Sequence, residues 1–229
     1  AVGSRTIEKA NEFADRYAIK NRHGTYQDLF NDPEVDAIYV ATHHPLHARD
    51  TINALNAGKP VLCEKPFSMS YAEAKSMIDT ARSKNLLLME AMWARFLPHM
   101  VRVREIIKSG VLGEIVSVRA DHGQWFKLDP EFRLFKPELG GGALFDLGIY
   151  PVSFANMVLG TPEKITARST KAFTGVDGQT SVILEYKNGA HALLNMTNLA
   201  PTPNRALIVG RDARIEIDRT YYALSLIHI

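Results

Sequence analysis

Short apolar runs alternate with amphipathic stretches through the first half of this chain. The runs with strand character are 1–3, 36–41, 61–64 and 86–90. The stretches in which apolar residues recur with helical periodicity are 6–18, 47–57, 70–84 and 95–108. Strands separated by helices at this spacing predict βαβ units, and nearly continuous apolar strands are typical of a parallel sheet that is buried on both faces.

The second half, from about Gly113, has a different pattern. Short strands follow one another here, at 115–122, 165–171, 181–186, 190–197, 206–209 and 214–217. Asn188-Gly189 is a strong hairpin signal, and only one long helix is expected, over 143–159. We therefore predict an α/β fold, with a Rossmann-type parallel sheet in residues 1–110 and an α+β domain with a largely antiparallel sheet in residues 111–223.

Both ends of the chain look cut. Ala1-Val2-Gly3 has the character of a strand end without its beginning, and residues 224–229 follow a plausible strand without continuing its pattern. These six residues are also what one reading frame of a common transposase sequencing adapter encodes. We expect 224–229 to be an artefactual tail and leave it out of the fold prediction.

Composition argues against several functional classes. The 229 residues carry a formal net charge of +2 without a basic run, so neither nucleic acid nor an anionic membrane is expected as a partner. No stretch approaches the roughly 20 apolar residues of a membrane span. The single cysteine, Cys63, cannot form an internal disulfide, which favours a reducing, cytoplasmic location.

The tripeptide Glu64-Lys65-Pro66 follows the third predicted strand, at the carboxyl edge where ligands bind in open α/β sheets. Lysine is rarely buried unless it is paired, so a lysine there needs a reason. Neighbouring strand residues face opposite sides, so Glu64 can accept from a ribose hydroxyl while Lys65 faces a substrate. Pro66 restricts Lys65 to an extended backbone, and the bond between them is a candidate cis bond. The alternative is a solvated lysine that ends a strand.

Two further loops follow predicted strands. Ser4 and Arg5 lie where a dinucleotide-binding sheet meets the adenosine ribose, and an arginine without an acid favours a 2′-phosphate; an ordinary helix start is the alternative. Residues 41–47 hold three histidines, but two adjacent histidines cannot easily face one ion, so no metal site is predicted. We expect this loop over the pyrophosphate and nicotinamide ribose, with His47 opening a helix; a polar turn is the alternative.

Three glycines, 140–142, precede the helix expected over 143–159 and let the backbone pass close to a ligand or another chain. Asp146 and Tyr150 are four residues apart, so we expect them on one face of that helix, whose other faces are apolar. Two polar groups in an apolar helix are costly to bury without partners. The alternative is a core tyrosine with a satisfied hydroxyl and an aspartate that caps the first turn.

Aromatic and basic residues lie in two loops beside these motifs. They are Trp93, Arg95, Phe96, Trp125, Phe126 and Arg133. Each is a candidate wall of a substrate pocket, and packing at a domain interface is the alternative.

Together these segments resemble the Gfo/Idh/MocA family of oxidoreductases. The resemblance is carried by residues 58–66, which end in Glu-Lys-Pro, and by residues 140–148. Residues 88–96, and a tyrosine at Tyr150 where many members have histidine, are similar to the branch of dimeric dihydrodiol dehydrogenases and NADP-dependent D-xylose dehydrogenases. Compared with the family, the first strand with its Gly-x-Gly-x-x-Gly loop is missing, as is the end of the second domain. We therefore assign function to the complete protein.

The resemblance implies a catalytic site between a Rossmann domain and an α+β domain, and a homodimer or higher homo-oligomer through the open sheet of the second domain. It implies Lys65 and Tyr150 as catalytic residues and Asp146 as a supporting acid. The cofactor-binding residues that we infer are Ser4, Arg5, Ala41, Thr42, His43, His47, Glu64, Lys65, Trp93 and Arg95. The substrate-binding residues that we infer are Trp93, Phe96, Trp125 and Arg133.

The function implied is oxidation of a secondary alcohol on a cyclic polyol, with NADP in preference to NAD as cofactor. The substrate is a trans-dihydrodiol or an aldopyranose such as D-xylose. Either Tyr150 is the base, aided by the ammonium of Lys65, or Lys65 is the base and Tyr150 orients the substrate. Rival hypotheses are a non-catalytic, NADP-sensing protein of the same fold and a structural dimerisation module.

Overall fold

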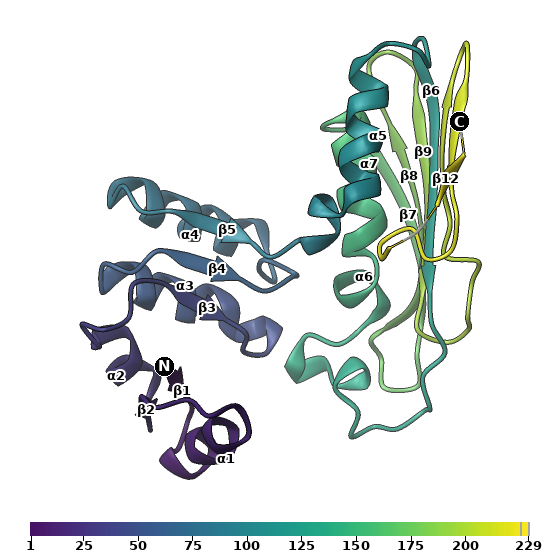
Figure 1. Ribbon diagram of the computed structural model, residues 1–229. Coiled ribbons are helices and arrows are strands. Elements are labelled where there is room, and N and C mark those ends of the chain that lie inside the picture. Colours follow the sequence, from purple (N-terminus) through teal and green to yellow (C-terminus); the bar gives the residue numbers. More distant parts are fainter. Residues whose placement is uncertain (225, 229) are drawn as a thin grey trace. The chain divides into compact units, whose positions relative to one another are not determined.

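The computed structural model describes residues 1–224 and 226–228. The chain divides into two compact units, Ala1–Ala91 and Met92–Ile229 (Figure 1). The predicted boundary lay near residues 110–113, about twenty residues later. The difference has a physical reason: helix α5 (Pro98–Lys108) buries Met100, Val103 and Ile106 in the apolar core of the second unit.

The first unit consists of short parallel strands and helices, as predicted. Its elements are β1 (Val2–Gly3), α1 (Ile7–Tyr17), β2 (Arg22–His23), α2 (Tyr26–Asn31), β3 (Ile38–Val40), η1 (His44–Leu46), α3 (His47–Asn56), β4 (Val61–Cys63), α4 (Tyr71–Ser83) and β5 (Leu88–Glu90). Strands β3, β4 and β5 form one parallel sheet, and β1 and β2 form a second. The parallel sheet is thereby confirmed, while β2 and α2 had not been predicted.

Side-chain caps set the starts of three of these helices. Thr6, Thr25 and Ser70 each accept a hydrogen bond from the backbone N–H three residues later, at 3.4, 3.1 and 3.2 Å. Glu73 accepts in turn from the N–H of Met69 at 2.8 Å, so the start of α4 has a reciprocal cap. At α2 the N-cap Thr25 and the acidic residue Asp28, three positions later, form a similar pair, which is a sequence signal for the start of that helix.

The core of the first unit lies between its helices and the sheet. Leu55 of α3, Cys63 of β4 and Met77 of α4 are fully buried there. The two sheets leave a groove of about 740 Å³ between β1 and β3, lined by both strands and by α1, α2 and the start of α3. Phe13 and Tyr17 of α1 are half exposed beside it, so only part of the predicted apolar face of that helix is covered.

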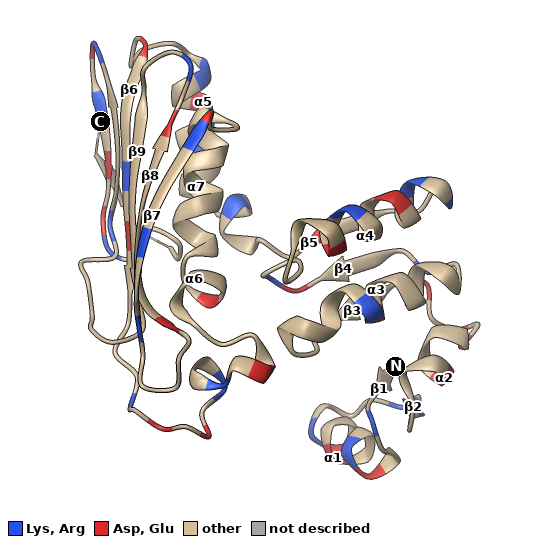
Figure 2. Cartoon of the chain, turned by 180° about the vertical axis from the view of Figure 1, so that it is seen from behind, with Lys and Arg blue, Asp and Glu red and all other residues tan. Residues whose placement is uncertain are grey.

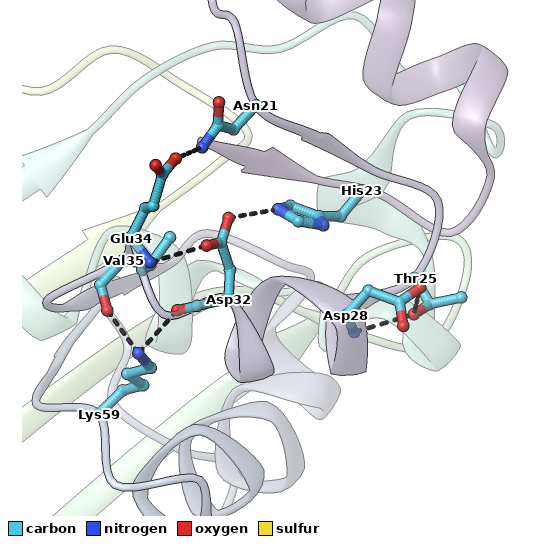
Figure 3. A network of polar contacts seen from close by, with 8 residues as sticks. All are labelled: Asn21, His23, Thr25, Asp28, Asp32, Glu34, Val35 and Lys59. Carbon is cyan, nitrogen blue, oxygen red and sulfur yellow. Dashed lines mark hydrogen bonds and ion pairs between the residues drawn. The ribbon is translucent and has the colours of Figure 1, made fainter.

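A polar network joins β2 to the segment before β3 (Figure 3). The ammonium of Lys59 donates to the carbonyl oxygens of Asp32 and Val35, at 2.8 and 2.5 Å. The carboxylate of Asp32 contacts Nε2 of His23 at 2.9 Å and accepts from the N–H of Glu34 at 2.8 Å. These bonds hold the turn that leads into β3.

The second unit is a seven-stranded sheet with helices on one face. Its elements are η2 (Trp93–Phe96), α5 (Pro98–Lys108), β6 (Ile115–Gly123), η3 (Arg133–Phe135), η4 (Pro137–Leu139), α6 (Ala143–Asp146), α7 (Ile149–Leu159), β7 (Lys164–Lys171), β8 (Asp177–Glu185), β9 (His191–Thr197), β10 (Ala206–Gly210), β11 (Arg214–Ile217) and β12 (Ile227–His228). The strand order is β12-β11-β10-β6-β9-β8-β7, and every neighbouring pair is antiparallel except β6 and β9. The largely antiparallel sheet is confirmed.

Helices α5 and α7 cover one face of this sheet (Figure 1). Val118, Ala192, Met196 and Ile208 are buried beneath them. The opposite face carries partly exposed apolar residues and a shallow depression of about 640 Å³. Figure 2 shows both signs of charge interspersed over the strands, without a continuous basic stretch.

The single helix expected over 143–159 is wrong. The structure has two helices, α6 and α7, interrupted at Leu147 and Gly148. Pro151 has no N–H, so the carbonyl of Leu147 lacks the partner that an unbroken helix would supply. A Cβ on Gly148 would lie 2.5 Å from the carbonyl oxygen of Leu144, so a glycine is needed for this approach.

The end of the chain pairs with the sheet. Ile227 lies opposite Ile217 and His228 opposite Glu216, so part of the segment predicted to be an artefactual tail forms a short strand. Ser225 and Ile229 of that segment lie outside the described residues. No single described helix is long and apolar enough to cross a membrane. Segments 137–146 and 149–159, bent by 46°, reach that length and composition only when taken together.

Candidate active site

Tyr150 is the second residue of α7, and its side chain is almost buried. Trp93, from η2 of the same unit, donates the indole N–H to the phenol oxygen of Tyr150 at 3.1 Å. The two rings meet edge to face, with centroids 6.1 Å apart. An indole can only donate, so the phenol oxygen is the acceptor in this bond.

An aromatic cluster surrounds the ring of Tyr150. His122 of β6 lies edge-on to it, with ring centroids 5.1 Å apart, and Tyr222 contacts it at 5.0 Å. His122 is itself stacked on Tyr222 at 3.9 Å. These contacts place the tyrosine ring among three other rings, Trp93 included, in the second unit.

His122 is buried, and hydrogen bonds define its tautomer. Its Nδ1 lies 3.1 Å from the carbonyl oxygen of Leu147, and its Nε2 lies 3.0 Å from the amide nitrogen of Gln124. A carbonyl only accepts, so Nδ1 carries the hydrogen and Nε2 accepts from Gln124. His122 is therefore a second donor to the carbonyl of Leu147, which also accepts from the N–H of Tyr150 and to which Pro151 cannot donate.

Asp146, at the end of α6, is buried and accepts from the guanidinium of Arg133 at 3.1 Å. The structure thus joins the predicted supporting acid to a predicted substrate residue from η3. Asp146 and Tyr150 were expected on one face of one helix, and this expectation is wrong because the helix is broken between them.

The start of α6 is held from the sheet. Asp177 of β8 accepts from the backbone N–H of Leu144 at 2.7 Å and from the hydroxyl of Thr180 at 3.2 Å. Burial raises the pKa of Asp177, and the hydrogen bond from Leu144 acts against this rise. Gly142 packs directly against the same carboxylate.

Glu64 and Lys65 follow β4, at the carboxyl edge of the parallel sheet, as predicted. One carboxylate oxygen of Glu64 accepts from the phenol of Tyr39, and the other accepts from the N–H of Lys65 at 3.0 Å. Burial, followed by this contact with Glu64, raises the pKa of Tyr39 to about 12. The bond between Lys65 and Pro66 is cis, as the sequence had indicated.

His47 begins α3 and is fully buried. Its Nδ1 lies 2.8 Å from the carbonyl oxygen of Pro66, and its Nε2 lies 2.9 Å from that of Thr42. The ring connects the loops after β3 and β4. Both nitrogens therefore face backbone carbonyls, whereas the sequence had placed this residue against the cofactor.

The remaining predicted cofactor residues line or border the groove of the first unit. These residues are Ser4, Arg5, Ala41, Thr42 and His43. Ser4 donates its N–H to the carbonyl of His23 at 3.1 Å, and Arg5 is exposed. Among the described residues, Oγ1 of Thr42 and Oδ2 of Asp50 are buried without a hydrogen-bond partner. Unsatisfied oxygens at this edge fit a ligand that brings hydroxyl or amide donors.

The predicted pocket walls lie on the surface of the second unit. Phe96 and Trp125 are about 60% exposed, and the side chain of Arg95 is exposed. Phe126 stacks on Phe132 with ring centroids 5.5 Å apart. Within the described part of the chain, no three His, Cys, Asp or Glu side chains are grouped so that they could hold a metal ion.

The second unit brings together Trp93 with Tyr150, and Arg133 with Asp146, whereas Glu64 and Lys65 belong to the first unit. His122, Gln124 and Tyr222 were not predicted. A signal for His122 was present, because it continues the inward alternation of Val118 and Ala120 along β6.

Known proteins match both units. Residues 1–92 match the oxidoreductase family with an NAD-binding Rossmann fold, and residues 100–216 match the GFO/IDH/MocA C-terminal domain. A trans-1,2-dihydrobenzene-1,2-diol dehydrogenase from Xenopus tropicalis is 40% identical over 219 residues, covering 95% of this chain and 66% of the relative. The chain thus spans slightly less than two thirds of that relative's length.

Two solved structures resemble the chain closely. A 3-ketoreductase from Actinomadura kijaniata in complex with NADP and TDP-benzene has a TM-score of 0.87 and 29% identity, over 99% of this chain and 71% of that one. A levoglucosan dehydrogenase in complex with NADH and levoglucosan has a TM-score of 0.90 and 25% identity, over 98% and 65%. With both units matched in order, the chain belongs to the Gfo/Idh/MocA family of oxidoreductases.

Proposed function

We propose that the full-length protein is an NADP-dependent oxidoreductase acting on a CH–OH group of a cyclic polyol. The candidate substrates are a trans-dihydrodiol and an aldopyranose such as D-xylose. The observation that carries the proposal is the hydroxyl of Tyr150, a buried residue, which accepts a hydrogen bond from Trp93 within an aromatic cluster. The relative named as a dihydrodiol dehydrogenase supports it at 40% identity.

The residues of the first unit fit a dinucleotide. The carboxyl ends of β3 and β4 carry Thr42 and Glu64, and Thr42 has a buried oxygen without a hydrogen-bond partner in the described structure. We assign Ser4 and Arg5 to a 2′-phosphate, which makes NADP the preferred cofactor over NAD. The loop of Ala41, Thr42 and His43 would hold the pyrophosphate. When bound, the nicotinamide supplies hydride transfer.

The chain's own residues would manage the proton. Tyr150 takes the proton of the reacting hydroxyl on its phenol oxygen, and the ammonium of Lys65 favours the phenolate that does so. Asp146, paired with Arg133, would orient other hydroxyls of the substrate. The alternative assignment makes Lys65 the base and leaves Tyr150 to orient the substrate.

The test is turnover of the full-length protein with NADP and a panel of xylose, glucose and trans-dihydrodiols. Tyr150→Phe and Lys65→Met should each lower kcat by about 10²–10⁴-fold while cofactor binding is kept. Tyr71→Phe and Lys108→Met, on the exposed surface, are the matched controls. Near-normal kcat in either site variant removes that residue from the mechanism. Cofactor binding without turnover of any substrate would favour a non-catalytic sensor.

We also propose a homodimer through the open face of the second sheet. Its depression is lined by three basic residues, by three acidic residues and by apolar side chains; the charged residues are Arg119, Arg168, Arg205, Asp121, Glu216 and Asp218. Equal numbers of both signs allow one face to pair with its own copy. Ile183 lines the depression on the open face, so Ile183→Glu should give a monomer in light scattering. Ile165 lies opposite Leu184, which faces the helices, so Ile165→Glu should leave the dimer intact. A monomeric parent protein would contradict this assembly.

We base the proposed cytoplasmic location on the free thiol of Cys63, which is buried in β4. Imaging of the full-length protein with a fluorescent tag at its C-terminus would test it. Accumulation in a secretory compartment would exclude it.

A further inference from the structure

We propose that Trp93 is a catalytic residue, whose indole N–H stabilises the phenolate form of Tyr150 during proton transfer. The inference rests on the proposed function, because it concerns the base of that reaction. It changes the predicted role of Trp93, which the sequence had assigned to contacts with cofactor and substrate. The evidence is the bond of 3.1 Å between the indole nitrogen and the phenol oxygen.

The chemistry of the two groups gives this bond its direction. An indole N–H is a donor only, so it occupies a lone pair of the phenol oxygen and leaves the O–H hydrogen to point elsewhere. The oxygen of Tyr150 thus already has a donor in place when its own proton is lost. A hydrogen bond to a charged acceptor is about twice as strong as one to a neutral acceptor. The N–H of Trp93 therefore favours the phenolate over the phenol.

The surroundings of Tyr150 keep this bond in position. His122 lies edge-on to the tyrosine ring, and its Nδ1–H bonds the carbonyl of Leu147, three residues before the tyrosine. The backbone N–H of Tyr150 bonds the same carbonyl at 3.2 Å. The ring and the backbone of Tyr150 are thus both tied to β6, so its oxygen has little freedom to turn away from Trp93.

Titratable groups face Tyr150 from each element packed on it in the second unit. They are His122 of β6, Tyr221 and Tyr222 of the segment after β11, and Arg95 of η2. Arg95 and Tyr150 both line one small cavity of the second unit. None of them is changed by replacing Trp93 with phenylalanine. A shift caused by that replacement is therefore assigned to the lost N–H.

The experiment measures kcat/KM against pH in the full-length protein and its Trp93→Phe variant. In the proposed mechanism kcat/KM rises with pH as Tyr150 loses its proton. Because the variant lacks the surplus of a charged over a neutral hydrogen bond, the midpoint of this rise should move up by about one pH unit. Below that midpoint the variant should be about tenfold slower, and well above it the two rates should converge. Trp125→Phe is the matched control, because it alters a proposed pocket wall without touching Tyr150 and should keep the midpoint.

A second measurement needs no turnover. The tyrosinate absorbance of each protein is titrated and corrected by its Tyr150→Phe counterpart, which isolates the signal of Tyr150. Replacing Trp93 by benzothienylalanine keeps the bicyclic ring and removes only the N–H, which covers the case in which phenylalanine disturbs folding. We expect the same upward shift in both variants.

The outcomes distinguish a failure of this inference from a failure of the proposed function. An unchanged midpoint in both the rate profile and the titration overturns the role of Trp93, even if the enzyme is active and Tyr150→Phe is inactive. Full activity of Tyr150→Phe instead refutes the proposed base. In that case the titration alone decides whether Trp93 favours the phenolate.

Discussion

Gly142 offers the sharpest test of how the candidate active site is built. It adopts φ +116°, a region that other residues rarely enter, and a Cβ at this position would lie 2.1 Å from Oδ1 of Asp177. The carboxylate cannot simply rotate away, because it holds the N–H of Leu144 at the start of α6. Gly142→Ala must therefore strain the backbone and break this bond.

The two costs can be estimated separately. A non-glycine residue in such a region costs about 1–3 kcal/mol, and loss of a hydrogen bond to a charged group costs about 1.5–3 kcal/mol. Gly142→Ala should therefore lower the free energy of unfolding by about 2.5–6 kcal/mol, measured by urea denaturation of the full-length protein. Gly189→Ala is the control: its φ is +81° with open space around it, so about 1–2 kcal/mol is expected.

A double-mutant cycle tests the cause. Asp177→Ala removes the carboxylate, so Gly142→Ala should cost less in that background, with a coupling of about 1.5–3 kcal/mol. Equal losses for Gly142→Ala and Gly189→Ala would refute the reasoning. Strict additivity with Asp177→Ala would refute it as well, because the clash would then not involve that carboxylate.

Three further predictions concern other parts of the chain. Lys59→Met should lower the free energy of unfolding by about 1–3 kcal/mol in urea, because the carbonyls of Asp32 and Val35 each lose the hydrogen bond from the ammonium, while the exposed Lys9→Met should change it little; equal effects would contradict the network. The N–H of Glu34, followed by His23, keeps the pKa of Asp32 below its usual value. Its stabilisation is therefore present above about pH 4 and lost as pH falls through the folded-state pKa, and Asp32→Asn should flatten this acid limb of stability. His122→Phe should lower kcat more than it changes KM, because the carbonyl of Leu147 loses its bond to β6 and keeps only the backbone N–H of Tyr150, and His122→Asn should recover part of kcat; equal rates in both variants would exclude this bond.

The order of elements was predictable because it depends on local periodicity. The strands β3, β4 and β5 lie within the predicted apolar runs but are shorter, with three residues each, and the helices α3 and α4 follow β3 and β4 as predicted. The hairpin at Asn188-Gly189 joins β8 to β9, as its turn chemistry indicated. β2 and α2 had not been predicted, because neither is long enough to show a period.

The site was less predictable, because its contacts join distant segments. Arg133 and Asp146 are separated by irregular chain and two 3-10 turns, so no spacing rule pairs them. Trp93 meets Tyr150 across 57 residues of sequence. The sequence did identify all four residues as candidates, since polar and aromatic side chains near glycines and strand ends are conspicuous. It did not predict which of them meet.

The break between α6 and α7, where one helix had been predicted, bears on the proposed chemistry. Apolar residues continue from 143 to 159, so the pattern predicted a single helix with Tyr150 in its interior. Pro151 and Gly148 together stop that helix, and α7 begins again just before the tyrosine. Tyr150 thus lies in the first turn, at the positive end of the helix dipole, where negative charge is favoured. At the break, the carbonyl of Leu147 accepts from both His122 of β6 and the N–H of Tyr150, which helps to hold the first turn in place. The same interruption that breaks the periodicity therefore places Tyr150 at the helix end where the proposed phenolate would be favoured.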